Sequence, residues 1–346
     1  MILRVTAAAL LAAAPAWGLS VGRLMDRIEA APPEERPALA RALGRSGKRK
    51  AGPALLKFLD FRQGDPRLTA AVVEALGLLG EERAGGALTD GWDYLDGLRA
   101  KLGVLPPHLQ VLRAQVAEAL GRTGGERAAL ILRGALRDDD PLVRRRAAEA
   151  LGALKDRDST PLLLDMAGSR DAGAAQSAVE ALGALGDRRA VAPLKALLRS
   201  PDPMTRVPAA YALARLKDGS GREALGAALR ESGPAGKADM LAAYYLVKLG
   251  ETQGLDHLVG LLADKDSRSR GLAAEALGKA GDPRAALPLA EVLSDDDPEL
   301  RLMAVRALGA VGGPRARYAL DRAKDDPNPA VRAAARMGLL ELGELR

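Results

Sequence analysis

The chain of 346 residues contains no cysteine, only two histidines, and few aromatic residues, which make up 3% of the sequence. The absence of cysteine excludes disulfides, thiol nucleophiles and thiolate-bound zinc or iron–sulfur sites. Neither His108 nor His257 has a metal-ligand partner at helical spacing, so we expect no metal site and no cofactor. Runs of β-branched and aromatic residues, which mark strands, are also missing. The abundant Ala, Leu and Gly instead predict an all-α protein with closely packed helices.

The charges are numerous but mixed in sign. Fifty-one basic and 45 acidic residues give a formal net charge of +6, and both signs are interspersed along the chain. A nucleic-acid interface more often shows a concentrated basic stripe with aromatic residues for stacking. Such a stripe is absent from the sequence, so a nucleic-acid partner is not favoured.

One pattern recurs along nearly the whole chain, and Ala178–Pro203 shows it best: a helix, a glycine, a short turn, a second helix and Asp-Pro. The repeats align on one leucine of the first helix, with a spacing of 31 residues in most cases, 33 in two and 44 in one. These anchor leucines are Leu43, Leu76, Leu120, Leu151, Leu182, Leu213, Leu246, Leu277, Leu308 and Leu339. A sustained period of this length is the signature of a stacked repeat architecture.

Two glycine columns accompany the anchor. The residue directly after it is glycine in seven repeats, as at Gly121 and Gly152. Glycine inside a helix costs about 1 kcal/mol relative to alanine, so its repetition predicts a neighbouring helix too close for a Cβ atom. Four residues after the anchor a second glycine predicts a left-handed helix end; Lys155 and Lys217 replace it in two repeats.

Each second helix carries a leucine twelve residues after the anchor, from Leu55 in the first repeat to Leu320 in the ninth. A leucine at every one of these places predicts a repeated buried contact. Asp-Pro precedes several first helices, including those starting after Asp140 and Asp326. Asp can cap the free backbone N–H groups of a helix start, and Pro fits the first turn.

These patterns divide the chain into a helix within 17–32 that caps the stack, repeats over 33–346, and a final half-repeat at 328–346. The 44-residue spacing places an insert at about 91–108, which we interpret as a lengthened second helix ending before Pro106-Pro107. The predicted fold is a right-handed α-solenoid of stacked helix-turn-helix repeats with a period of about 31 residues.

The first 16 residues have the features of a secretory signal peptide. Arg4 gives a positive start, an apolar run follows from Val5 to Ala14, and Ala14-Pro15-Ala16 fits a small-x-small cleavage site. The run is shorter than the roughly 20 residues needed to span a bilayer. The alternative is an Ala-rich first helix of the fold. We favour the signal, which predicts a periplasmic or extracellular protein without a membrane span.

The repeat unit resembles the HEAT-like repeats of the phycobilisome-lyase type. The resemblance rests on DDPLVRRRAAEALGAL and DDPELRLMAVRALGAVG, and it covers about residues 33 to 346. It implies a HEAT-like solenoid. Proteins with such repeats include scaffolds, adaptors and accessory factors for bilin attachment or removal, so the resemblance by itself does not choose among these functions.

An arginine stands seven residues before the anchor in seven repeats, at Arg36, Arg113, Arg144, Arg206, Arg270, Arg301 and Arg332. It could form a cationic ladder for an anionic partner. We favour a structural ladder, in which each arginine binds a loop carbonyl or a capping Asp of its own or the next repeat. The acidic runs Asp138–Asp140 and Asp295–Asp297 end at helix starts and lack the spacing of a calcium loop, so we predict no metal there.

Two departures from the repeat are the candidate contact residues for a partner. One lies in and beside the insert, where acidic residues share a helical face next to an aromatic pair: Asp90, Asp93, Asp96, Trp92 and Tyr94. The other places tyrosines in a column otherwise rich in Glu, at Tyr211, Tyr244 and the adjacent Tyr245. Tyr and Trp are enriched at interface hot spots. Local packing is the alternative at both places.

We find no catalytic motif, so the sequence predicts a binding protein and not an enzyme. The leading hypothesis is an exported, monomeric scaffold or adaptor that binds a protein or peptide on the surface of its second helices. One alternative is an accessory factor, lyase-like or chaperone-like, for a chromophore- or cofactor-bearing protein. The other is a HEAT-like nucleic-acid binder, which only the positive charge supports.

Overall fold

The computed structural model describes residues 21–169, 171–231, 236–264 and 266–344. Every regular element in these residues is a helix, which confirms the predicted all-α fold. The chain divides into two compact units, Met1–Ala190 and Val191–Arg346. The predicted signal peptide, residues 1–16, lies outside the described residues.

In the first unit the α-helices alternate between first and second helices of successive repeats, after one preceding helix, α2. Their bounds are α2 Val21–Ala30, α3 Arg36–Arg45, α4 Gly52–Leu55, α5 Pro66–Leu79, α6 Ala84–Leu102, α7 Pro107–Thr123, α8 Glu126–Ala135, α9 Pro141–Leu154, α10 Thr160–Ala167 and α11 Ala172–Leu185. Short 3₁₀ turns lie at Arg49–Ala51, Leu56–Phe58, Arg157–Ser159 and Arg188–Ala190.

The second unit continues the alternation. Its helices are α12 Val191–Leu197, α13 Pro203–Arg215, α14 Gly219–Glu231, α15 Lys237–Lys248, α16 Thr252–Leu262, α17 Ser267–Ala280, α18 Ala286–Glu291, α19 Pro298–Val311, α20 Gly313–Ala323 and α21 Pro329–Glu344. Two 3₁₀ turns, Pro283–Ala285 and Val292–Ser294, flank α18.

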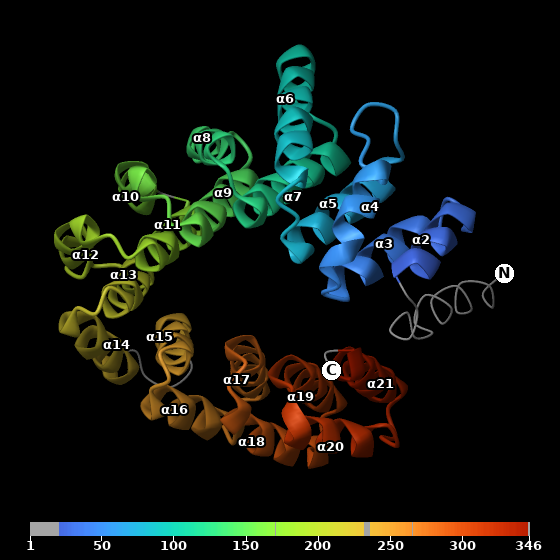
Figure 1. Cartoon of the computed structure of the whole chain (residues 1–346). Coiled ribbons are helices and arrows are strands. Elements are labelled where there is room, and N and C mark those ends of the chain that lie inside the picture. Colours follow the sequence, from blue (N-terminus) through green and yellow to red (C-terminus); the bar gives the residue numbers. More distant parts are fainter. Residues whose placement is uncertain (1–20, 170, 232–235, 265, 345–346) are drawn as a thin grey trace. The chain divides into compact units, whose positions relative to one another are not determined.

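Within each unit the helices form two layers (Figure 1). The first helices α3, α5, α7, α9 and α11 pack in sequence in the first unit, as do α13, α15, α17, α19 and α21 in the second. The second helices form the other layer, and α6 is the longest of them, at 19 residues. No helix of the described residues is long and apolar enough to cross a membrane.

The glycine after the anchor allows neighbouring first helices to approach closely. A Cβ atom built on Gly121 would lie 2.4 Å from Cβ of Ala150, and one on Gly278 would lie 2.8 Å from Cα of Ala307. Real Cβ atoms do not come this close to other atoms. The close packing predicted from the glycine column is therefore confirmed.

The predicted ends of most first helices are also confirmed; the exception is α21, which continues past its glycine of this column to Glu344. Gly80, Gly186 and Gly281 adopt the left-handed conformation, and Lys155 and Lys217 do so at φ 55° and 62°. These lysines adopt a backbone conformation that is rare for residues other than glycine. The chain therefore turns in the same way whether or not glycine is present.

The capping aspartates behave as predicted at most helix starts, with one exception. The carboxylate of Asp140 accepts the backbone N–H of Leu142, and that of Asp297 accepts the N–H of Glu299. The last helix differs, because α21 starts at Pro329 and its N-terminal amide groups are bound by Asn328. Asp326 does not cap it, because its carboxylate binds an arginine of the preceding repeat.

The leucine twelve residues after the anchor is fully buried in every repeat. Its side chain has 0% exposure at all nine places: Leu55, Leu88, Leu132, Leu163, Leu194, Leu225, Leu258, Leu289 and Leu320. Burying each leucine contributes about 1.5–3 kcal/mol. The contact between second and first helices is therefore the repeated hydrophobic element of the fold.

Candidate functional site

Trp92 of α6 is a packing residue and not an exposed contact residue. Its ring is 6% exposed, and the guanidinium of Arg113 on α7 lies 4.3 Å from the ring centroid. Arg113 is itself 3% exposed and donates to Asp96 at 2.9 Å and to Asp138 at 2.5 Å. Arg113 and the neighbouring helices cover the ring, so its burial does not favour the predicted contact between Trp92 and a partner.

The remaining acidic residues of α6 are also paired within the unit. Asp90 and Asp93 both bind Arg127 of α8. Tyr94 is half-buried, and the guanidinium of Arg62 lies 5.7 Å from its ring centroid. The insert therefore uses its charges to attach α6 to its neighbours.

The three tyrosines on α13 and α15 lie together, and both of their ring contacts run through Tyr245. The rings of Tyr211 and Tyr245 stack with centroids 4.1 Å apart, and Tyr244 lies 5.4 Å from Tyr245. Tyr211 is 7% exposed and Tyr245 1%, so both are core residues of the second unit. Their burial does not favour the predicted contact with a partner, whereas Tyr244 is half-exposed.

The arginine column forms a structural ladder. Arg144 donates to the carbonyls of Asp138 and Asp139 and to the carboxylate of Asp171 in the next repeat. Arg301 repeats this arrangement with the carbonyl of Asp295 and the carboxylate of Asp326. The other members make contacts of the same kind: Arg36, Arg206 and Arg332 with loop carbonyls, Arg113 with Asp138, and Arg270 with the carbonyl of Leu262 and with Asp295.

The ladder explains the acidic runs. In each run the first aspartate, Asp138 or Asp295, pairs with the ladder arginine of the preceding repeat, and the third caps the following helix. The hydrogen bond from Arg301 also holds the pKa of Asp326 below its usual range. Among the described residues no group of three His, Asp or Glu side chains is arranged to hold a metal ion.

A second set of ion pairs was missed in the sequence. It uses an acidic residue five positions after the anchor, in the turn between the two helices of a repeat. Asp156 binds Arg133, Asp218 binds Lys195 and Glu251 binds Arg222, each from the second helix of the preceding repeat. At the same position Asp187 accepts from Arg189 and from Thr160, and these bonds hold its pKa far below the usual range. The acidic column was the signal for this contact.

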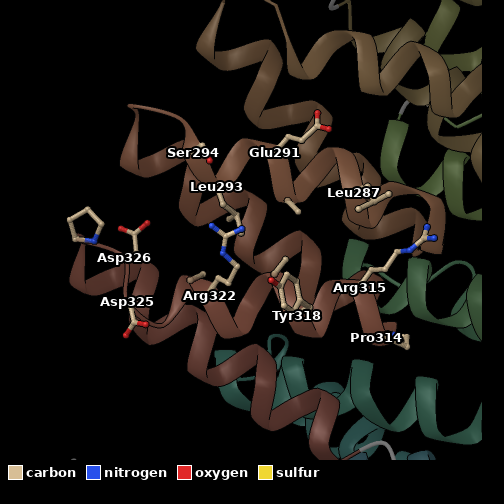
Figure 2. Close-up of a pocket in the computed structure, with 14 residues that line it drawn as sticks. Leu287, Glu291, Leu293, Ser294, Pro314, Arg315, Tyr318, Arg322, Asp325 and Asp326 are labelled. Atoms are coloured by element: carbon tan, nitrogen blue, oxygen red, sulfur yellow. The ribbon is translucent and has the colours of Figure 1, made fainter.

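The ladder residues thus have structural roles, and an open apolar surface on the second helices lies between α18 and α20. It encloses a hollow of about 750 Å³, which we call the α18–α20 hollow. Leu287 is 53% exposed and Tyr318 is 69% exposed at its wall. Ala290 and Ala319 also line the hollow, and their small side chains leave the space between α18 and α20 open. Figure 2 shows Leu287 on α18 and Tyr318 on α20, the two second helices that line this hollow.

The charges at this hollow are less completely paired than those of the ladders. Arg315 and Arg322 are exposed and form no ion pair with any residue that the structure describes. They lie one turn on either side of Tyr318 along α20. The carboxylates of Glu291 and Asp325 are also at the rim, whereas that of Asp326 is bound by Arg301. The hollow thus offers apolar side chains between polar groups of both signs.

A column of the repeat alignment marks this surface. Leu287 and Tyr318 both stand ten residues after their anchor leucine, as does Leu130 of α8, which is 63% exposed. At this position the other repeats carry Pro, Gly, Ala or an acidic residue. Two successive large apolar residues in an exposed column were therefore the sequence signal for the hollow.

The stacked helix pairs define an all-α solenoid repeat protein. The model of the HEAT repeats matches residues 22–101, 109–182, 168–238, 191–271 and 255–340. The chain belongs to the HEAT repeat family, and its repeats resemble those of the phycobilisome-lyase type, as its sequence predicts.

Solved structures with a similar chain come from several kinds of protein. Human deoxyhypusine hydroxylase in complex with glycerol is 23% identical, covers 75% of this chain and 99% of its own, and has a TM-score of 0.38. The complex of CpcE and CpcF of phycocyanin lyase from Nostoc sp. PCC7120 is 20% identical, with 95% and 98% coverage and a TM-score of 0.34. An engineered protein is also 20% identical, with 93% and 98% coverage and a TM-score of 0.35. No curated protein sequence matches the chain.

Proposed function

We propose that this HEAT repeat protein is an exported, non-catalytic scaffold that binds a protein or peptide partner at the α18–α20 hollow. The observation that carries the proposal is the exposure of Leu287 and Tyr318 beside one hollow, with Arg315 and Arg322 unpaired among the described residues. Other conspicuous aromatic side chains, those of Trp92 and Tyr245, are buried.

The physical basis is the burial of apolar surface beside polar groups that fix the orientation of the partner. Tyr and Arg are enriched among the residues that dominate binding energy, and such residues cluster in desolvated pockets. The helices that form the hollow are anchored by Leu289 of α18 and Leu320 of α20, which are fully buried, so its walls are held in place before binding. A preorganised surface loses less conformational entropy when a partner binds.

The proposed export rests on residues 1–16, where a positive start, an apolar run and a small-x-small site occur in order. Mass spectrometry of the protein from the cell envelope tests it. We expect the mature chain to start at Trp17. An intact Met1 in the envelope fraction would contradict cleavage, and recovery only from the cytoplasm would contradict export.

The binding site is tested by a photocrosslinking amino acid incorporated at position 291, at the rim of the hollow. The probe is carried in the natural sequence, in Tyr318→Ala and in Leu130→Ala. Leu130 is a matched control, since it is an exposed apolar residue in the same column on α8.

We expect one dominant crosslinked product, identified by mass spectrometry, with the same yield in Leu130→Ala. Tyr318→Ala should weaken binding about 30-fold or more, because truncating a hot spot costs about 2 kcal/mol or more. The proposal fails if Tyr318→Ala gives the same product at equal yield at limiting protein concentration, or if no product forms.

A further inference from the structure

A second candidate surface lies in the first unit, on the layer of first helices. Two adjoining hollows open there, one of about 730 Å³ over α3, α5 and α7, and one of about 330 Å³ over α5, α7 and α9. Val111 and Gln115 of α7 line both of them. We call the two together the first-helix groove; it shares no residue with the α18–α20 hollow.

The charges along this groove balance. Four arginines and four carboxylates line it: Arg41, Arg67, Arg122, Arg146, Glu34, Asp65, Glu74 and Glu118. Five of the eight bind one another, in two pairs across neighbouring helices and one pair within α7. Arg41 lies 3.0 Å from Glu74, and Glu118 lies 2.8 Å from Arg122 and 3.6 Å from Arg146. A strongly charged partner would gain little at such a surface, because it would compete with pairs already formed.

Between these pairs the groove presents aliphatic side chains. Leu78 of α5 is 42% exposed and Val111 of α7 is 48% exposed. Leu142 of α9 is half-buried and lines the same hollow. Because they come from three successive first helices, a chain lying across the layer would pass over all of them.

Gln115 supplies the observation that points to a ligand with amide groups. Its Oε1 atom is buried and has no hydrogen-bond donor among the residues that the structure describes. Buried polar atoms are normally paired. Because the Oε1 atom is closed off from solvent, a ligand supplies the missing donor when the terminal amide of Gln115 turns toward the groove that its side chain lines. The glutamine side chain carries both an acceptor and two donors, which match the N–H and C=O of one peptide unit.

We propose that the first-helix groove binds an extended, uncharged peptide segment with aliphatic side chains, whose backbone N–H donates to Oε1 of Gln115. Neighbouring packed helices lie about 8–10 Å apart, so a chain crossing from α3 to α9 spans roughly 24–30 Å. At about 3.3 Å per residue that distance takes seven to nine residues. Successive side chains of an extended chain point to opposite sides, so every second residue would face the groove.

A fluorescein-labelled nonapeptide amide, Ser-Val-Ser-Leu-Ser-Val-Ser-Leu-Ser, is the probe for fluorescence anisotropy. We expect a Kd below 1 mM with the full chain. Gln115→Met, which keeps the length of the side chain and removes its amide, should weaken binding about three- to tenfold, the effect of one hydrogen bond. Val111→Ser should also weaken binding, and Tyr318→Ala should leave it unchanged.

Two further peptides keep the test independent of how the variants fold. In one the central amide is N-methylated, and it should bind the natural sequence at least about threefold more weakly. In the other both leucines are replaced by glutamate, and it should also bind more weakly. Far-UV circular dichroism and the Tm of each variant check its folding.

Three outcomes overturn the proposal. They are no binding of the probe at 1 mM, equal binding of the N-methylated peptide, and tighter binding of the acidic peptide. Unchanged affinity in a folded Gln115→Met variant removes the role of the amide and overturns the proposal as stated. Loss of probe binding in Tyr318→Ala would show that the peptide binds elsewhere, which also overturns it.

Discussion

Helix α6 and the α18–α20 pair both combine aromatic, aliphatic and arginine side chains, but they use them in opposite ways. In α6 the indole of Trp92 is covered by Arg113, and the nearby aspartates bind arginines of α7 and α8. At the α18–α20 hollow Tyr318 is 69% exposed, and Arg322 has no ion pair among the described residues. The interruption of the repeat thus serves packing, whereas two repeats of regular length carry the open surface.

This difference teaches that irregular sequence and exposed surface are separate properties in this repeat protein. A lengthened helix must bury its extra residues or pair them, and α6 does both. In a repeat of regular length, the leucine, glycine and Asp-Pro positions that recur along the chain already determine the fold. Its exposed column, ten residues after the anchor, is then free to carry side chains such as Leu287 and Tyr318.

The largest predicted effect separates the two arginine environments. Arg113→Ala should lower the free energy of unfolding by as much as about 3–5 kcal/mol, because it removes the nearest cation from the buried carboxylate of Asp138 and leaves only the more distant Arg99, at 3.6 Å. Arg322→Ala should change it by less than about 0.5 kcal/mol, as for other exposed positions. Urea titration followed by far-UV circular dichroism measures both. Equal changes in the free energy of unfolding would contradict the proposed difference between the buried Arg113 and the exposed Arg322.

The next effect concerns the close approach of first helices. Gly121→Ala should destabilise the first unit by about 1–3 kcal/mol, because the new Cβ would overlap Ala150. Gly97→Ala is the matched control, since Gly97 lies inside α6 with no atom within 4 Å of its Cβ position. It should stabilise α6 by about 0.5–1 kcal/mol. Shifts of Tm in the same direction for both variants would contradict the packing role of Gly121.

Acid should weaken the ladder pair at the edge of the α18–α20 hollow. The pKa of Asp326 is lowered in the folded protein by its hydrogen bond to Arg301, so its contribution to stability is present above the unfolded value of about 3.9. It is lost as the pH falls through the lowered folded value.

Asp326→Asn removes this titration. Between pH 6 and pH 3 the free energy of unfolding of this variant should therefore fall by on the order of 1 kcal/mol less than that of the natural sequence. Tm values at both pH values, compared with the natural sequence, give the measurement. Asp325→Asn is the control, because Asp325 is exposed and should leave the pH dependence nearly unchanged. A pH dependence of Asp326→Asn equal to that of the natural sequence would show that the pair does not couple to folding.

The smallest predicted effect on the stability of the protein comes from removing the exposed side chains at the α18–α20 hollow. Tyr318→Ala and Leu287→Ala should each change the free energy of unfolding by no more than about 0.5 kcal/mol, because both side chains are largely exposed. A combination of unchanged Tm and lost partner binding would identify these residues as contacts. A fall in Tm of several degrees would instead assign them to packing, as for Trp92.

The sequence by itself determined the helical repeat, its helix ends and its core. Periodic leucines, glycines and Asp-Pro pairs specify these features because each acts within one repeat or on the adjacent one at a fixed spacing. The fully buried Leu194 and the left-handed Gly186 are examples. The structural role of the arginine ladder followed from the same regularity.

Only the tertiary structure decided which of the irregular side chains are exposed. Trp92 is covered by an arginine 21 positions later in the chain, and Tyr211 stacks on a tyrosine 34 positions later. Whether such rings are buried depends on the distance and direction of the neighbouring helix, which the spacing within one repeat does not specify. For the same reason the unpaired Oε1 atom of Gln115 and the hollow lined by Leu287 and Tyr318 are seen only in the packed repeats.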